Sequence, residues 1–229
     1  KGMVFDDRRA EPGAENVLGK TYPGDGVEPV RAMLADLAAR PETAAHIAGK
    51  LAVHFVSDTP DPDLVAAISA AYLASSGDLM ACYGAMLQHP AAWGGTLEKV
   101  RQPYDLIAAA LRALGATGAQ VVKFDKAQLR TIISAPMGAM GQPFKLAKGP
   151  NGFPEEPEAW ITPQGLAHRI SWAMQVPERV AKPLPDPLTL VQTCLADQAS
   201  ADLLWAVERA EDQKQGVGLV LASADFNRR

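Results

Sequence analysis

The sequence predicts an all-α protein. Apolar residues make up 48% of the 229 residues and aromatic residues only 6%, which indicates closely packed helices with small contact residues. Apolar side chains recur every three or four positions, and proline or aspartate often begins such a segment. We therefore expect a two-layer, multi-helix bundle with orthogonal and antiparallel neighbours, a short N-terminal extended arm or hairpin, and one long Pro/Gly-rich loop.

Residues 1–26 are expected to form the extended arm or hairpin. The stretch FDDRRAEPGAENVLGKTYPGDG, from Phe5 to Gly26, is rich in turn-forming residues and has too little periodicity for a helix.

Residues 27–115 are expected to form a compact helical bundle. The stretch VEPVRAMLADLAAR predicts the first helix, with an apolar stripe at Val30, Met33, Leu34 and Leu37. The next helix, in 41–57, is expected to bury one face, formed by Ala44, Ile47, Ala48, Leu51 and Phe55.

Capping residues define the remaining helices of this bundle. Asp61 is the expected N-cap of the third helix, and Gly77 lies just past its end. Asp78 is expected to cap the fourth helix, and a fifth runs from Pro103 to Gly115. The connections are short, which favours antiparallel neighbours.

The second half of the chain combines irregular and helical segments. Residues 116–161 are expected to form a linker, a short helix in DKAQLRTIIS, and an irregular segment over 135–161. Residues 162–229 are expected to form C-terminal helices that pack on the bundle within a single domain. These helices should begin at Thr162 and near Asp186, Ser200 and Gln213.

The segment GPNGFPEEPEAWITP, residues 149–163, is unusually rich in proline and glycine. Its prolines favour one defined path over a flexible tether, and Trp160 offers one large anchor. Two interpretations remain open. In the first, Trp160 fastens the loop to the helices as a structural strap; in the second, the loop forms a pocket rim with Asn151, Trp160, His168 and Arg169.

Charge and hydropathy argue against two classes of partner. The net charge is −4 and no dense run of lysine or arginine occurs, so a nucleic acid partner is not expected. No apolar run approaches the ~20 residues that a transmembrane helix requires, so no transmembrane segment is expected. The polar helix faces carry mixed charge, which argues against docking on a membrane surface.

The sequence predicts no metal or cofactor site. His46 and His54 are separated by eight positions, or ~12 Å along a helix, with Lys50 between them. The glycine-containing segments lack the spacing of a phosphate-binding loop, and Ser57 lacks the glycine-flanked elbow of a hydrolase nucleophile. Cys82 and Cys194 are expected to be buried thiols.

Two arginines lie on largely apolar helices and need acceptors or solvent. Arg112 lies in the last turn of its helix, where helix-terminal carbonyls can accept its hydrogen bonds. Arg169 could stack on Trp172 one turn later. Alternatively, Arg112, His168 and Arg169 could grip an anionic ligand.

Several segments occur in an order that resembles one bacterial protein family. These are AEPGAENVLGKTY, RPETAAHIAGKLAVHFVSDTPDPDLV, GDLMACYGAML, KVRQPYDLIAAALRALG, MGQPF, PNGFPEEPEAWITPQGLAHRISWA and LASADF. The chain resembles the family called domain of unknown function 1800 from about Phe5 to Phe226. Typical members are longer, so the resemblance implies roughly the carboxyl-terminal half of one.

The resemblance has limited functional implications. It implies an exported or periplasmic protein whose partner could be an exported protein of a companion uncharacterised family. Many members have histidine before the Glu-Pro-Gly triplet, where this chain has Ala10, although Glu11 could still accept a hydrogen bond. Our leading hypothesis is a helical binding or interaction domain. The alternative is part of an enzyme for an anionic or sugar-like substrate, with a site shared with a missing N-terminal half.

Overall fold

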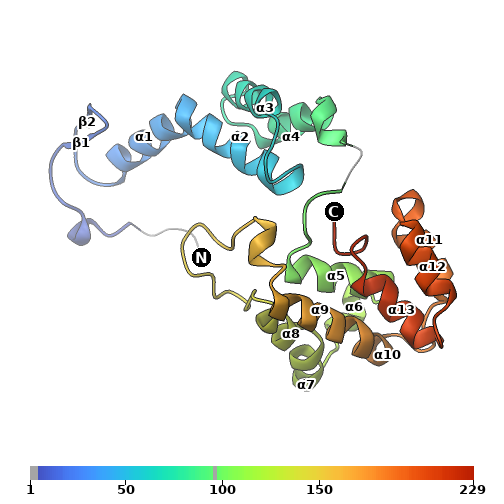
Figure 1. Ribbon diagram of the computed structural model, residues 1–229. Coiled ribbons are helices and arrows are strands. Elements are labelled where there is room, and N and C mark those ends of the chain that lie inside the picture. The colour runs from blue at the N-terminus through green and yellow to red at the C-terminus, as the bar shows by residue number, and fades with distance from the viewer. Residues whose placement is uncertain (1–4, 95–96) are drawn as a thin grey trace. The chain divides into compact units, whose positions relative to one another are not determined.

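The protein is mostly helical, with one small two-stranded sheet (Figure 1). The computed structural model describes residues 5–94 and 97–229. The prediction of a helical fold with a short N-terminal hairpin is therefore confirmed. The chain divides into two compact units, residues 1–95 and 96–229. Each unit has its own hydrophobic core.

The first unit begins with a short 3₁₀ helix, η1 (Asp7–Arg9), followed by the hairpin. Strands β1 (Glu15–Val17) and β2 (Lys20–Tyr22) are antiparallel, with Val17 opposite Lys20. The two connecting residues, Leu18 and Gly19, both have positive φ, as the tightest hairpin turns require. Tyr22 of β2 is the one buried residue of the two strands.

Four helices and a 3₁₀ turn complete the first unit. They are α1 (Val27–Ala38), α2 (Pro41–Phe55), α3 (Pro62–Ala74), α4 (Leu79–Gln88) and η2 (Pro90–Trp93). The core consists of Ala44, Ala48, Ala52, Leu64, Ile68, Tyr72, Cys82 and Met86. Alanines four residues apart on α2 leave little side-chain bulk between α2 and the neighbouring α3.

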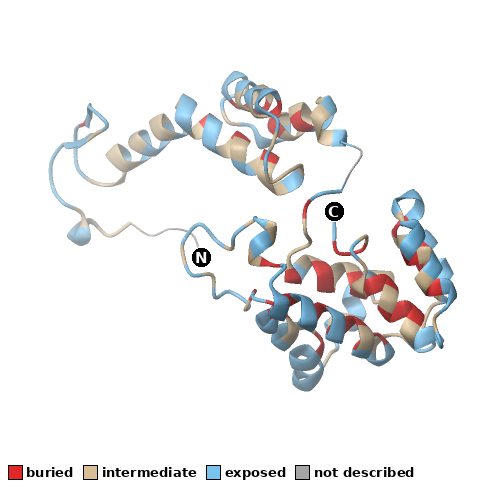
Figure 2. Cartoon of the chain, in the orientation of Figure 1, coloured by how far each residue is buried: buried red, intermediate tan, exposed pale blue. Residues whose placement is uncertain are grey.

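Two apolar faces predicted for this unit differ from the structure. Phe55, which we expected to be buried, is 55% exposed, and Leu34 of the predicted α1 stripe is 52% exposed. The buried stripe of α2 runs through Ala44, Ala48 and Ala52, so the end of the helix turns Phe55 to the edge of the core. Helix α1 has no buried residue (Figure 2).

The second unit is larger and contains the remaining helices. They are α5 (Pro103–Ala113), α6 (Gly118–Val121), α7 (Lys126–Gln128), α8 (Ala135–Ala139), α9 (Pro163–Gln175), α10 (Pro177–Val180), α11 (Pro187–Cys194), α12 (Ala201–Glu208) and α13 (Gln213–Ala222). A π-helix, η3 (Leu129–Ser134), joins α7 to α8, and η4 (Pro157–Ala159) and η5 (Ala196–Gln198) are 3₁₀ turns. Gly216 and Gly218 let α13 approach its neighbours closely, because a Cβ there would meet Pro187 or Met174.

The predicted helix starts are confirmed by side-chain caps. Asp61, Asp78, Thr162, Asp186 and Ser200 each accept a hydrogen bond from a backbone N–H in the first turn of the helix that follows. Local sequence therefore determines where these helices begin.

The structure places α5 in the second unit, whereas the sequence pattern predicts it within a helical bundle over residues 27–115. Leu106, Ile107, Ala110 and Leu111 of α5 belong to the core of the second unit. The apolar stripe of a helix does not specify which other helix will cover it, so only packing decides this assignment. The short helix predicted at 125–134 also continues into α8, which shortens the irregular segment.

The end of the chain pairs with the segment that precedes α5. Val100 and Arg228 form an isolated antiparallel bridge. The Arg101 N–H donates to Asn227 O at 2.8 Å, and the Arg229 N–H donates to Lys99 O at 2.8 Å. This pairing holds Asn227 in the interior of the second unit.

Within the described residues, no helix has the length and apolar character needed to cross a membrane.

Candidate functional site

The π-helix η3 is the most unusual backbone element of the second unit. A capping box starts the preceding turn: the Gln128 N–H donates to Asp125, and the Asp125 N–H donates to Gln128. In an α-helix, Ile132 O would accept from the residue four positions later, but that residue is Pro136, which has no N–H. The Trp172 Nε1–H of α9 donates to Ile132 O instead, at 2.9 Å.

A groove of about 390 Å³ lies beside this hydrogen bond. Residues of η3 and α8 form one wall, and residues of α9 and α10 form the other. Thr131, Ala135, Pro136, Ala139, His168, Ser171, Trp172, Gln175, Val176 and Arg179 line it. π-Helical turns are frequent at functional sites, and this volume falls within the range of small-molecule sites. We therefore take this groove as the candidate functional site.

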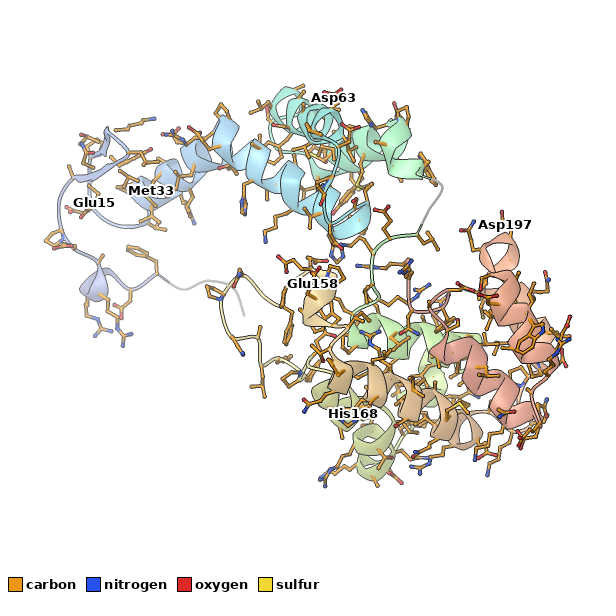
Figure 3. All side chains as sticks on the ribbon, viewed as in Figure 1. Glu15, Met33, Asp63, Glu158, His168 and Asp197 are labelled. Atoms are coloured by element: carbon orange, nitrogen blue, oxygen red, sulfur yellow. The ribbon has the colours of Figure 1, made fainter. Side chains whose placement is uncertain are left out.

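The groove combines apolar surface with a polar rim. Trp172 and Val176 are buried in its floor, and Ala139 and Pro136 add further apolar surface. The polar side chains are Thr131, His168, Ser171, Gln175 and Arg179. His168 and Arg179 are the ionisable residues among the ten that line the groove, and none of the ten is acidic. His168, labelled in Figure 3, is exposed on α9.

Arg169 lies on the side of α9 that faces the core, about 100° around the helix from His168. It is 1% exposed. Its Nη1 donates to Asn227 Oδ1 at 2.8 Å, and its Nη2 donates to Arg101 O at 2.9 Å. Burial lowers the pKa of this guanidinium to about 10. Arg169 therefore bonds to neutral acceptors of the chain rather than to the groove or to Trp172.

The Pro/Gly-rich loop is fastened to the start of α5. Trp160 is 1% exposed, and its ring centroid lies 6.2 Å from that of Phe153. Gln102 Nε2 donates to Pro154 O at 3.4 Å, and the buried Lys99 Nζ lies 3.5 Å from Glu155 Oε2. Asn151 is exposed, in the turn between Gly149 and Gly152. These contacts favour the interpretation of the loop as a strap.

Comparison with known protein families identifies the family of this chain. The family described as "Protein of unknown function (DUF1800)" matches residues 1–228. The chain belongs to the DUF1800 family. No curated protein and no solved structure matches it. The function of this DUF1800 protein must therefore be argued from its own residues.

Of the six site residues predicted for this DUF1800 chain, only His168 lines the groove. Arg112 is exposed in the last turn of α5, and Glu11 is exposed in the first unit. Asn151 and Trp160 lie in the loop, and Arg169 lies in the core. His168 and Arg169 differ in position because successive residues of a helix point about 100° apart.

Four polar groove residues of the DUF1800 chain were not among the predicted site residues: Thr131, Ser171, Gln175 and Arg179. Ser171 and Gln175 follow His168 on α9 at spacings of three and four residues, which places these three on one helical face, and Arg179 follows on α10. That polar stripe was the available signal. Thr131 carried no such signal, because it comes from another segment and reaches the groove only through packing.

Two other cavities are weaker candidates. One of about 400 Å³ lies at the end of α5, where Leu114, Gly115 and Ala116 face Lys182 and Pro183. Its lining includes one ionisable side chain, that of Lys182. The other, of about 110 Å³, lies beside the hairpin. There the Lys20 ammonium and the Tyr22 hydroxyl both bind Asp36, and these bonds lower the pKa of that carboxyl.

The described residues offer no metal centre and no activated thiol. No group of three or more His, Cys, Asp or Glu among them could hold a metal ion. Burial raises the pKa of both Cys82 and Cys194, which disfavours the reactive thiolate. Cys82 is buried as predicted, whereas Cys194 is only partly buried.

Proposed function

We propose that the second unit is a ligand-binding domain and that its ligand occupies the groove between η3–α8 and α9–α10. The supporting observation is the composition of this groove, with a buried apolar floor and five polar side chains at its margin. Ligand pockets typically combine a predominantly apolar lining with a few polar groups that orient the ligand.

The size of the groove favours a small molecule. Its volume of about 390 Å³ lies within the range of small-molecule sites.

The chemistry of the groove favours binding over catalysis. His168 and Ser171 both line it, but no hydrogen bond joins them in the structure described. No acidic residue in the lining could orient the imidazole, and a serine nucleophile needs both the base and the orienting group. Arg112, His168 and Arg169 do not line a common pocket, because only His168 lies in the groove. This geometry does not support the alternative of an enzyme in which these three residues bind an anionic substrate.

The cellular setting of the proposal is an exported bacterial protein. The proposed export rests on the resemblance to the DUF1800 family, whose members resemble exported proteins. A periplasmic or extracellular location is tested by fractionating the bacterium that encodes the protein. Detection of the native protein only in the cytoplasmic fraction would contradict it.

A groove-filling variant tests the binding site. Ala139→Trp adds an indole to an exposed position on the groove wall. We prefer it to a change at Ala135, because that residue precedes Pro136 and bulky side chains there meet the ring. The neutral dye N-phenyl-1-naphthylamine, whose fluorescence increases in an apolar environment, serves as the probe. We expect its affinity to fall at least about tenfold in Ala139→Trp, the equivalent of one 1.4 kcal/mol contact.

Ala127→Trp is the matched control, because Ala127 is an exposed alanine on α7 that does not line the groove. It should bind the dye as the unaltered protein does. Equal binding by both variants, or no dye binding by the unaltered protein, would contradict the proposed site.

A further inference from the structure

The charge of the groove indicates which ligands it would accept. Its ionisable residues, His168 and Arg179, can each carry a positive charge, and none of its other lining residues is ionisable. A cationic ligand would therefore find no counter-charge in the lining. An anionic ligand would find a guanidinium, whose planar donors match a carboxylate.

Arg179 is available for such a ligand. It is exposed, and within the described residues no carboxylate forms an ion pair with it. The neighbouring Glu178 pairs instead with Lys214 of α13, at 2.7 Å. Asp125, six residues before Thr131, accepts a hydrogen bond from the Gln128 N–H at the start of α7. The two acidic residues nearest in sequence to the groove walls are thus engaged elsewhere.

The polar and apolar parts of the groove are arranged along α9 and α10. His168 lies on α9, and Arg179 lies on α10, eleven residues later. Trp172 and Val176 lie between them and are buried. A ligand that uses both parts has an apolar body over this floor and a charged group at the Arg179 end.

We propose that the groove binds a small aliphatic carboxylic acid, with its carboxylate on Arg179 and its hydrocarbon chain over Trp172 and Val176. This inference rests on the proposed function, because it names the class of ligand for the same groove. It also gives Arg179 a specificity role that the dye experiment does not test.

Three eight-carbon compounds that differ in their head group test the inference. Octanoate, 1-octanol and octylammonium are titrated into the full chain by calorimetry. We expect octanoate to bind about tenfold more tightly than octanol, the effect of one charge-assisted hydrogen bond at an exposed site. Octylammonium should bind most weakly. Equal or tighter binding of octanol or octylammonium would overturn the inference.

Arg179→Gln isolates the guanidinium. It should reduce octanoate affinity to that of octanol and leave octanol affinity unchanged. Arg112→Gln is the matched control, since Arg112 is an exposed arginine outside the groove lining, and it should retain the full preference for octanoate. Unchanged octanoate preference in Arg179→Gln, or the same loss in both variants, would overturn the assignment of Arg179.

The dye separates this inference from the proposed function. The unaltered protein could bind the dye, lose that binding in Ala139→Trp, and yet show no preference for octanoate. That result would support the groove as a binding site and overturn only the inference that its ligand is a carboxylic acid. Tighter binding of the peptide acid N-acetyl-Leu-Val-Leu than of octanoate would also overturn the choice of an aliphatic acid, in favour of a peptide C-terminus.

Discussion

At the scale of single residues, Arg169 shows how a buried cation can be accommodated without a carboxylate. Its guanidinium donates to Asn227 Oδ1 and Arg101 O, and its Nε is buried without a hydrogen-bond partner in the structure described. The amide of Asn227 also donates to Leu221 O at 3.2 Å and Ser223 O at 2.8 Å. Asn227 therefore connects the end of α13, the C-terminal segment and α9.

Asn227→Ala should destabilise the second unit by about 2–4 kcal/mol, because it removes these bonds and leaves a buried donor of Arg169 without its acceptor. Urea unfolding followed by tryptophan fluorescence measures the change. Asn151→Ala is the control, because the exposed Asn151 should tolerate substitution within about 0.5 kcal/mol. A loss for Asn227→Ala as small as that of the control would mean that Arg169 finds another acceptor.

At the scale of secondary-structure elements, the contact between η3 and α9 connects the two walls of the groove. Pro136 has no backbone N–H to donate to the Ile132 carbonyl. The Trp172 indole of α9 donates to that carbonyl instead. This hydrogen bond joins the two walls of the groove. The same residue contributes apolar surface to the groove floor.

Trp172→Phe should destabilise the protein by about 1–3 kcal/mol, because the buried Ile132 carbonyl loses this donor. The loss should be smaller in a Pro136→Ala background, where residue 136 regains an N–H that Ile132 O can accept. Urea unfolding of the two single variants and the double variant gives the coupling between them. Additive losses would show that the two donors do not substitute for one another.

At the scale of the whole molecule, the two units differ in how well they can support themselves. The described core of the second unit contains twenty buried residues, and that of the first contains eight, three of them alanine. The two cores share no residue. Since apolar burial is the main stabilising contribution, the second unit should be the more stable of the two.

A fragment of residues 97–229 should therefore fold on its own. Its buried Trp160 and Trp172 report on unfolding, whereas Trp93, in the first unit, is exposed. We expect a cooperative urea transition at the same midpoint as the later transition of the full chain. A fragment of residues 5–94 should unfold at lower urea concentration. A non-cooperative transition of the larger fragment would show that its core needs residues from the first unit.

The sequence was sufficient for the features that depend on local chemistry. Helix starts at Asp61, Asp78 and Thr162 could be predicted because a capping side chain acts within its own first turn. The helical class and the hairpin followed from periodicity and turn residues. The polar face of α9 that contains His168, Ser171 and Gln175 was also present in the spacing, although His168 alone was recognised as a candidate.

Only the tertiary structure decided how these elements face one another. It placed α5 with the second core, left Phe55 exposed, turned Arg169 into the interior and brought Thr131 to the groove. Periodicity specifies that a helix has an apolar face, but not which helix covers it or which side of that face remains open. Those choices depend on contacts between residues far apart in the sequence, and such contacts leave no local pattern.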